Sequence, residues 1–290
     1  MSRALPIAAV QAAPQPLTEP LSTFADETAE LMRRFPQTEL IVYPELHLFG
    51  ASGVTADDEM SDAAEPLDGP RMKELGELAG DLGVWLLPGS VCERGPEGQL
   101  FNTAPMFSPQ GTMVAHYRKV FPWRPYEPFD PGDKFVVFDI DGIGTAGVNI
   151  CYDAWFPEVT RHLAWMGAEV VFNLVKTTTA DRAQEVVLAR ANAIVNQVFV
   201  VSVNCAGPEG TGLSLVVDPE GLVRSATSGV NETVLTDVLD LDQVTRVRKY
   251  GTAGLTRVWD QLQPEDAPVA LPLYGGAIDP TRWTPARRPI

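Results

Sequence analysis

The sequence predicts a layered α/β fold with mixed β-sheets. Short apolar runs rich in Val, Ile and Phe alternate along the 290 residues with longer segments of helical period, which is typical of sheets covered by helices. Gln110-Gly111 and Pro219-Glu220-Gly221 lie between apolar runs and predict hairpin turns. Some neighbouring strands must therefore be antiparallel, and a mixed sheet is expected.

The apolar runs predict strands, in chain order, at Ile7–Gln11, Leu40–Tyr43, Val84–Val91, Thr103–Ser108, Thr112–His116, Phe135–Ile140, Thr145–Ile150, Val170–Leu174, Val198–Val203, Leu213–Val217 and Val234–Leu239. Helix-forming composition predicts helices at Leu21–Arg34, Pro70–Leu82, Pro157–Met166 and Arg182–Asn196. The last of these places Val187, Ala191, Ile194 and Val195 on one apolar face.

The segments between these elements predict the organisation of the chain. Ala56–Gly69 is acidic and Phe121–Asp133 is rich in proline, and both are expected to be long loops with a function. No internal repeat or linker divides the chain, so residues 1–263 are expected to form one domain. From Pro264 the chain is rich in Pro and Gly, which predicts an extended C-terminal arm over 264–290 that a neighbouring subunit holds.

Composition and charge exclude several classes of partner. The formal net charge is -16, and the densest basic cluster is Arg246-Arg248-Lys249, so a nucleic-acid partner is not expected. The apolar run that ends at Val10 is too short for a secretory signal and is interpreted as a buried strand. No apolar stretch is long enough for a membrane helix. We therefore expect a soluble protein with no membrane partner.

The three cysteines, Cys92, Cys151 and Cys205, form neither a CxxC motif nor a disulfide framework, which favours a reduced, cytoplasmic setting. Cys151 directly follows a predicted strand and precedes a helix that Pro157 can open. At such an elbow a thiol lies near backbone amides that favour a thiolate and an oxyanion. A single cysteine is more often a buried core residue, so this position alone leaves both interpretations open.

Glu45 and Lys119 also follow predicted strands. A carboxylate buried at the end of Leu40–Tyr43 would have a raised pKa and could act as a general base, although a solvated loop glutamate fits as well. Lys119 could stabilise negative charge on a carbonyl oxygen, or belong to a surface Arg-Lys pair. Glu127 follows in a loop that prolines stiffen.

The histidines do not support a cysteine–histidine pair. His162 lies on the helix after Cys151 and His47 lies near Glu45, but neither is in a position that favours a general base, and His116 is no better placed. Clustered metal ligands are also absent from the sequence, so no metal site is predicted.

Several motifs together resemble the nitrilase superfamily of carbon–nitrogen hydrolases, whose members use a Glu-Lys-Cys triad. The motifs are Ala8-Ala9-Val10-Gln11, Tyr43-Pro44-Glu45-Leu46, Tyr117-Arg118-Lys119, Asn149-Ile150-Cys151-Tyr152-Asp153 with Phe156-Pro157-Glu158, Gly167-Ala168-Glu169, Arg190-Ala191-Asn192-Ala193 with Asn196, Val203-Asn204 and Val217-Asp218-Pro219-Glu220-Gly221. The resemblance extends from Leu5 to Asp240.

The resemblance implies an α-β-β-α sandwich with two mixed sheets that packs into a four-layer dimer or a higher homo-oligomer. It implies Glu45, Lys119 and Cys151 as the catalytic residues, with the backbone N–H of Tyr152 helping Lys119 to hold the oxyanion. Substrate positioning is expected from Glu127, Tyr152, Trp155 and Lys176. No metal or organic cofactor is implied, and the expected partner is a small amide.

The branch of the family is indicated less directly. Cys151-Tyr152-Asp153 is similar to amidases and N-carbamoyl amino acid hydrolases rather than to nitrilases, and Pro122-Trp123-x-Pro125-x-Glu127 resembles aliphatic amidases and formamidases. The segment Lys176-Thr177-Thr178-Thr179 departs from the aliphatic amidases.

An amidase is the favoured hypothesis. An N-carbamoyl amino acid hydrolase, with Lys176, Arg124 or Arg182 holding the substrate carboxylate, and a nitrilase are alternatives. A non-catalytic interaction protein of the same fold is a further hypothesis, and the presence of all three triad residues weighs against it.

Overall fold

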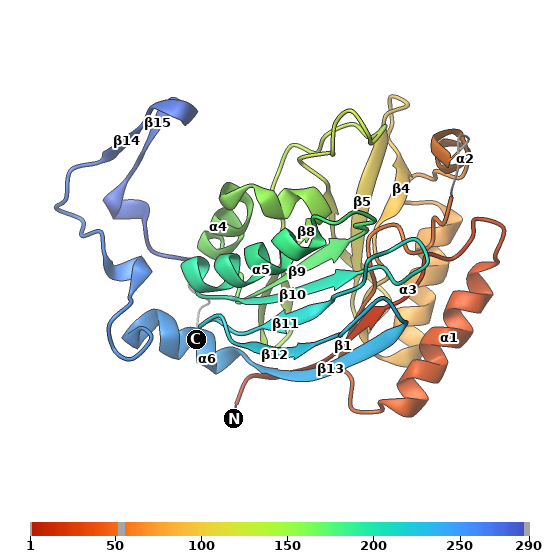
Figure 1. The fold of residues 1–290 in the computed structure, drawn as a ribbon, viewed down its shortest axis with the longest axis horizontal. Helices are drawn as coiled ribbons and strands as arrows, with labels where there is room; N and C mark the ends of the chain where they lie inside the picture. Colours follow the sequence, from red (N-terminus) through yellow and green to blue (C-terminus); the bar gives the residue numbers. More distant parts are fainter. Residues whose placement is uncertain (1, 52–55, 287–290) are drawn as a thin grey trace.

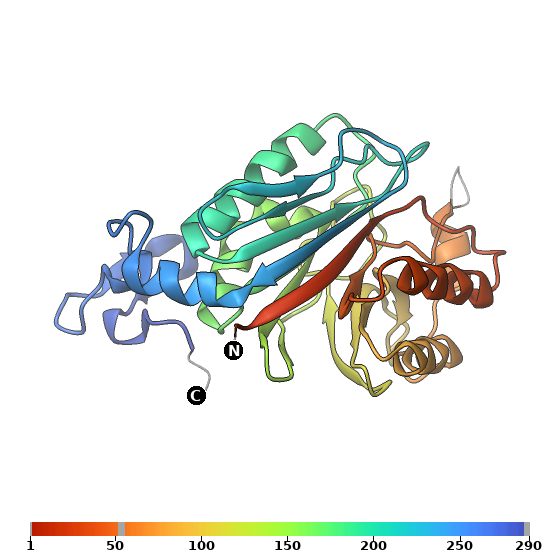
Figure 2. The same ribbon diagram turned by 90° about the horizontal axis from the view of Figure 1, so that it is seen from below.

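Two large β-sheets face each other and carry helices on their outer surfaces, as Figures 1 and 2 show for a computed structural model that describes residues 2–51 and 56–286. The first sheet has the strand order β13-β1-β2-β3-β5-β4, with β6 paired to β5, and the second has the order β12-β11-β10-β9-β8-β7. The predicted α/β class with two mixed sheets is confirmed. The dimer stays a prediction.

The strands of the first sheet are β1 (Ala4–Gln11), β2 (Leu40–Val42), β3 (Trp85–Leu87), β4 (Val91–Arg94), β5 (Leu100–Phe107), β6 (Met113–Arg118) and β13 (Thr233–Asp240). Those of the second are β7 (Val137–Ile140), β8 (Gly144–Ile150), β9 (Val170–Val175), β10 (Phe199–Asn204), β11 (Leu215–Val217) and β12 (Val223–Ala226). The predicted hairpins connect β5 to β6 and β11 to β12, and both pairs are antiparallel. The pairs β1·β2, β2·β3, β8·β9 and β9·β10 are parallel.

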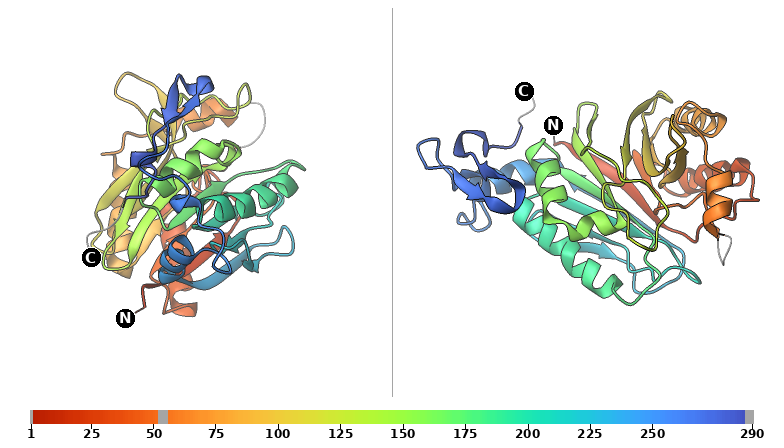
Figure 3. Two further views of the ribbon diagram at one scale, coloured as in Figure 1. Left: turned by 90° about the vertical axis from the view of Figure 1, so that its left-hand side faces the viewer. Right: turned by 90° about the horizontal axis from the view of Figure 1, so that it is seen from above.

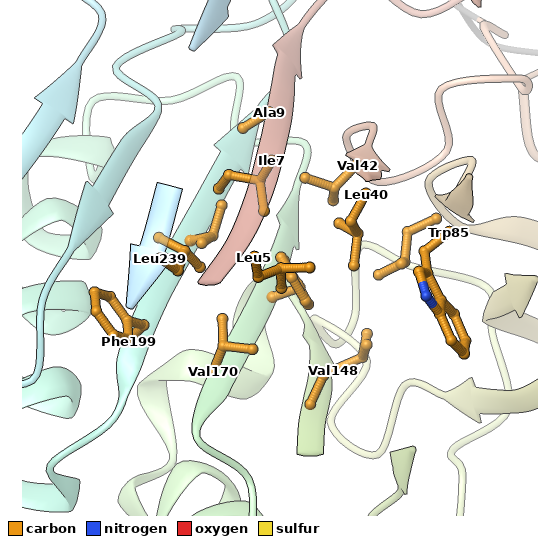
Figure 4. Close-up of a cluster of buried hydrophobic side chains, with 14 of the residues drawn as sticks. Leu5, Ile7, Ala9, Leu40, Val42, Trp85, Val148, Val170, Phe199 and Leu239 are labelled. Atoms are coloured by element: carbon orange, nitrogen blue, oxygen red, sulfur yellow. The ribbon is translucent and has the colours of Figure 1, made fainter. Parts of the chain in front are cut away.

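The side chains of each strand alternate between two cores because successive residues point to opposite faces of a sheet. Leu5, Ile7 and Ala9 of β1 belong to the core between the sheets, whereas Ala8 and Val10 belong to the core under the helices of the first sheet. Figure 4 shows the inter-sheet core, in which the labelled residues of β1, β2 and β3 lie opposite those of β8, β9 and β10. Packing of these side chains thus fixes the position of one sheet relative to the other.

Helices cover the outer face of each sheet. They are α1 (Leu21–Arg34), α2 (Ala56–Asp62) and α3 (Pro70–Leu82) on the side of the first sheet, and α4 (Pro157–Trp165) and α5 (Arg182–Asn196) on the second, as the right-hand view of Figure 3 shows. The short 3-10 helix η1 (Cys151–Trp155) connects β8 to α4, and α6 (Leu241–Tyr250) follows β13. Among the described residues, no helix is both long and apolar enough to cross a bilayer.

Several predicted elements were wrong in extent. Val84–Val91 is not one strand, because Gly89 interrupts it with a positive φ of 92°. Gly89 also packs so closely against Pro44 that a Cβ there would be 2.1 Å from the Pro44 carbonyl oxygen. The turn at Gly89 separates β3 from β4. The predicted loop Ala56–Gly69 contains α2, and the strand predicted at Thr103–Ser108 begins three residues earlier, at Leu100. The strand β12 and the helix α6 are among the elements that had not been predicted.

The apolar face predicted on α5 faces outward. Val187, Ile194 and Val195 are 64%, 43% and 44% exposed, and Ala191 is exposed as well. The opposite face, which packs on the second sheet, carries small and polar side chains, among them Ala189, Asn192, Ala193 and Asn196. The expectation that an apolar face marks the core side was wrong for this helix, because its buried side combines two alanines with polar and charged side chains that are also buried.

The C-terminal segment projects beyond the sheets, at the left of Figure 1, and returns to α4. It begins with η2 (Val258–Asp260), which precedes the predicted arm. Where an extended arm had been predicted from residue 264, it contains η3 (Pro272–Tyr274), η4 (Pro280–Arg282) and an antiparallel pair of short strands, β14 (Val269–Leu271) and β15 (Gly276–Ile278). The Trp165 indole donates to the Arg282 carbonyl at 2.6 Å, which ties the segment to α4. Residues 287–290 of the predicted arm lie outside the described residues.

Candidate active site

Glu45 lies just beyond the carboxyl end of β2 and is only 2% exposed. Its Oε1 accepts hydrogen bonds from Lys119 Nζ at 2.9 Å and from Asn102 Nδ2 at 2.8 Å, and its Oε2 accepts one from the backbone N–H of Lys176 at 2.9 Å. Donors from β5, from the end of β6 and from the end of β9 therefore fix the carboxylate between the two sheets. Three hydrogen bonds compensate much of the cost of burying its charge.

Lys119 directly follows β6 and is completely buried. Its backbone N–H donates to the Asn102 carbonyl, and its Nζ lies 2.9 Å from Glu45 Oε1 and 2.6 Å from Glu127 Oε1. Burial alone disfavours the ammonium, but the nearby acidic groups Glu45, Cys151 and Glu127 outweigh it, and the pKa of Lys119 is raised. The structure thus holds a permanent cation in the interior.

Glu127 reaches this cation from the proline-rich loop after β6. One carboxylate oxygen, Oε1, is bound to Lys119, whereas Oε2 is buried and has no hydrogen-bond partner among the described residues. The pKa of Glu127 is raised, first of all by burial. The charge of Glu45 raises the pKa further, whereas the Lys119 ammonium lowers it. An unpaired acceptor beside a buried ion pair is costly in the free protein and suits a ligand that donates a hydrogen bond.

Cys151 lies at a strained elbow between β8 and α4. Its φ of 48° is in the left-handed region that non-glycine residues rarely occupy, and η1 begins at this residue. The side chain of Asp153 fixes the elbow, because it accepts hydrogen bonds from Ile150 N at 2.9 Å, Phe121 N at 2.9 Å and Tyr117 Oη at 2.7 Å. The loop after Lys119 and the elbow at Cys151 are therefore held by one carboxylate.

The surroundings of Cys151 favour a thiol in the free protein. Burial raises its pKa first of all, the charge of Glu45 raises it further, and Lys119 opposes both. The residue nevertheless keeps part of its surface accessible. Because the thiol is the weaker nucleophile, Cys151 needs a base, and Glu45 is the carboxylate whose charge affects it most.

The other predicted positioning residues lie around this centre but differ in what they contact. The rings of Tyr152 and Trp155 are 6.1 Å apart, and the Trp155 Nε1 is buried with no hydrogen-bond partner among the described residues. Lys176 contributes its backbone N–H to Glu45, while its Nζ lies 3.7 Å from Glu209. The structure therefore brings the backbone of Lys176 into the site and pairs its side chain with a carboxylate.

Two further arginines and the three histidines are also candidates for the site from the sequence. Arg182 is buried in an ion pair with Glu185, at 3.1 Å, and Arg124 is exposed. His47 is buried against Phe24 and Tyr43, where burial lowers its pKa to about 3 while the Ala13 backbone partly offsets this. His162 is exposed and lies 2.7 Å from the Glu158 carbonyl through Nδ1. His116 is half-buried on β6, and in the described part of the chain none of the three histidines hydrogen-bonds Cys151.

Sequence reasoning missed Asn102, Asp153 and Thr177 as parts of the site. Asn102 lies within a strand, and only its register opposite Lys119 shows its contact with Glu45. Asp153 was quoted in a motif but given no role. No group of three or more His, Cys, Asp or Glu side chains that could hold a metal ion occurs within residues 2–51 and 56–286.

Known proteins with similar sequences and structures hydrolyse carbon–nitrogen bonds. Residues 6–249 match the family model of carbon-nitrogen hydrolases. The formamidase of Pseudomonas syringae pv. tomato is 32% identical over 227 residues, which are 77% of this chain and 66% of the formamidase. This chain thus spans slightly less than two thirds of that relative.

Two solved structures are also similar. Nit3 of Saccharomyces cerevisiae, a member of branch 10 of the nitrilase superfamily, has a TM-score of 0.77 and 27% identity over 85% of this chain and 93% of its own. A variant of the amidase from Nesterenkonia sp. AN1, with the acetamide moiety of fluoroacetamide added covalently at the active-site cysteine, has a TM-score of 0.69 and 26% identity over 86% of this chain and 94% of its own.

Proposed function

Because this chain belongs to the carbon-nitrogen hydrolase family, we propose that it is an amidase that converts a small or medium carboxamide to a carboxylate and ammonia. The observation that carries the proposal is the buried chain of Glu45, Lys119 and Glu127 beside Cys151. It combines a base, a fixed cation and a free acceptor around one partly accessible thiol. The formamidase and amidase relatives support the same class of reaction.

In the first half of the reaction, Glu45 takes the thiol proton as Cys151 Sγ attacks the carboxamide carbon. The carbonyl π electrons move to oxygen, and the Lys119 ammonium together with the backbone N–H of Tyr152 stabilises the resulting oxyanion. Glu45 then gives its proton to the amide nitrogen. Ammonia leaves as the C–N bond breaks, and a thioester on Cys151 remains.

In the second half, Glu45 takes a proton from a water molecule whose oxygen attacks the thioester carbon. The tetrahedral intermediate collapses, the C–S bond breaks, and the proton returns to sulfur, which leaves the carboxylic acid and the free thiol. Each half needs Glu45 once as a base and once as an acid. No step in this scheme uses a metal or an organic cofactor.

Glu127 has the position to select a primary amide. Its Oε1 is occupied by Lys119, and its Oε2 is an acceptor with no protein donor among the described residues. The N–H₂ group of a carboxamide offers the hydrogen bond that this oxygen lacks, and a nitrile offers none. This contact favours an amidase over a nitrilase.

The alternative of an N-carbamoyl amino acid hydrolase needs a cation that binds the substrate carboxylate. Lys176 Nζ is paired with Glu209, and Arg182 is buried against Glu185, while Arg124 lies exposed on the loop. The side chains of Lys176 and Arg182 are thus already paired with carboxylates, which supports a neutral substrate. Comparing ammonia release from acetamide with hydrolysis of an N-carbamoyl amino acid separates the two activities.

Self-association is part of the proposal. The exposed apolar face of α5, formed by Val187, Ile194 and Val195, is a surface that a second copy can cover, in keeping with a homodimer or a higher homo-oligomer. The low cysteine content and the absence of a disulfide framework support a cytoplasmic location, and the negative net charge argues against nucleic acid as a partner.

The decisive experiment measures ammonia release from formamide, acetamide and propionamide by the purified chain and by a Cys151→Ala variant. We expect activity in the former and none above background in the latter. Cys205→Ala, which removes another buried thiol, is the matched control and should retain activity. Ammonia release by Cys151→Ala at the rate of the unmodified protein would overturn the proposal, and no ammonia release by the unmodified protein would favour the non-catalytic hypothesis.

A further inference from the structure

The segment Lys176-Thr177-Thr178-Thr179, which departs from the aliphatic amidases, places one threonine against the nucleophile. Thr177 follows β9 and is 5% exposed, and its Oγ1 lies 3.9 Å from Cys151 Sγ, within range of a weak hydrogen bond to sulfur. Its backbone is fixed, because its N–H donates to Asn204 Oδ1 and its carbonyl accepts from Thr211 Oγ1. Thr177 therefore cannot move away from Cys151 without breaking these bonds.

The Thr177 hydroxyl also contacts a buried carboxylate on α5. Its Oγ1 lies 2.9 Å from Glu185 Oε1 and 2.7 Å from Glu185 Oε2, and Arg182 NH1 donates to Glu185 Oε2 at 3.1 Å. The Arg182 guanidinium is itself held by Ser202 Oγ and by the carbonyls of Gly212 and Leu213. A guanidinium stays charged in proteins, so it donates to Glu185, whose oxygens are the acceptors for both Arg182 and the Thr177 hydroxyl.

These contacts fix the direction of the hydrogen bond to sulfur. A hydroxyl has one proton, and the Thr177 proton points to Glu185 because a carboxylate can only accept. The oxygen that faces Cys151 then presents a lone pair, so the thiol is the donor and Thr177 the acceptor. A thiolate has no proton to donate in this contact. Its negative charge would face the lone pair of the Thr177 oxygen and the charge of Glu185, and both would repel it.

We infer that Thr177 is a positioning residue that accepts the Cys151 S–H and holds the resting nucleophile as a thiol, with the buried Arg182–Glu185 pair fixing the hydroxyl direction. The inference rests on the proposed role of Cys151 as nucleophile. Two groups of charged side chains interact electrostatically with Cys151. The first is Glu45, Lys119 and Glu127, and the second is the pair of Glu185 and Arg182. The thiol thus stays protonated until a substrate is bound and Glu45 takes its proton during the attack.

The test is the pH dependence of alkylation of Cys151 by iodoacetamide, followed by mass spectrometry of the labelled peptide. Thr177→Val keeps the size of the side chain and removes the acceptor, so the neutral thiol loses stabilisation. We expect the midpoint of the alkylation profile to fall by about half a pH unit, and the rate below the midpoint to rise about threefold. Thr177→Ser should restore the profile of the unmodified protein.

Thr178→Val is the matched control, since Thr178 is exposed in the same segment, and it should leave the profile unchanged. Thr177→Ala removes the same hydroxyl with less crowding and gives a second measurement if the valine variant does not fold. An unchanged midpoint in folded Thr177 variants would overturn the inference, and so would a higher midpoint, which would mean that Thr177 donates to the thiolate. If Cys151 in the unmodified protein is not the fastest cysteine to react, the proposed function fails instead.

Discussion

Glu127 and Lys119 form an incomplete ion pair, in which Oε1 of the carboxylate lies 2.6 Å from the ammonium and Oε2 is buried with no hydrogen-bond partner among the described residues. Lys119 also contacts Glu45, so one cation holds two carboxylates between the sheets. A buried acceptor without a donor costs free energy that a bound carboxamide can recover through its N–H₂ group. This relationship connects the charge arrangement of the site to the proposed substrate.

The first prediction concerns Glu127. A Glu127→Gln variant loses the charge that pairs with Lys119. Its amide presents either the carbonyl oxygen, which accepts a hydrogen bond, or the N–H₂ group, which donates one, to the substrate. We expect kcat/KM for acetamide to fall by about 10²-fold, because the amide is no longer held for attack. Steady-state ammonia release measures this, and iodoacetamide labelling of Cys151 should show that the thiol remains reactive.

The control for Glu127 is Glu77→Gln on the exposed side of α3, which should retain the activity of the unmodified protein. If Glu127→Gln hydrolyses acetamide as fast as this control, the buried Oε2 has no role in binding the amide.

The second prediction concerns Asp153, the carboxylate that holds the elbow. In Asp153→Asn, an N–H₂ group replaces one acceptor and faces donors from Ile150, Phe121 or Tyr117. We expect a loss of about 2–4 kcal/mol in the free energy of unfolding, measured by urea denaturation, together with a large fall in kcat. Tyr117→Phe removes only one of the three hydrogen bonds and should cost about 1 kcal/mol. Equal, small losses for both variants would mean that Asp153 does not organise the elbow.

The third prediction is a pH dependence of stability caused by His47. Burial lowers the pKa of this histidine from 6.5 to about 3 in the folded protein, so between these values the unfolded chain binds a proton that the folded chain does not. The contribution is fully present above about pH 6.5 and is lost as the pH falls towards 3, by about 1.4 kcal/mol per pH unit.

A His47→Phe variant keeps an aromatic ring against Tyr43 and removes the ionisable group. Urea unfolding of both proteins between about pH 7 and pH 4 should show that the unmodified protein loses stability more steeply. His162→Phe replaces an exposed histidine and should follow the unmodified protein. Parallel curves for the unmodified protein and His47→Phe would contradict the prediction.

The fourth prediction concerns the outward face of α5. A Val187→Glu substitution places a charge in the middle of the exposed apolar face and should shift the protein towards a monomer, measured by light scattering coupled to size-exclusion chromatography. Val114→Glu places the same charge at a 43% exposed position on β6, in the other sheet, and should leave the assembly unchanged. An identical mass for both variants and the unmodified protein would exclude α5 from the interface.

Local sequence patterns predicted many elements and the chain positions of the candidate site. Strand-like runs precede Glu45, Lys119 and Cys151, and in the structure each of these residues directly follows or closely follows a strand. The periodicity of apolar residues gave wrong predictions where contacts with other parts of the fold determine the local structure. The apolar stripe of α5 faces outward while alanines and buried polar side chains form its inner side, and Gly89 interrupts an apolar run because Pro44 lies too close for a Cβ.

The sequence by itself therefore determined the α/β class, the family resemblance and the chain positions of the candidate catalytic residues, because strand and helix periods and short motifs are local properties of the chain. Only the tertiary structure decided that Asn102 donates to Glu45, that Asp153 joins the elbow to the loop after Lys119, and that Thr177 lies between Cys151 and Glu185. Such hydrogen bonds depend on the register of the strands and on the packing of two sheets, which residue order alone does not specify.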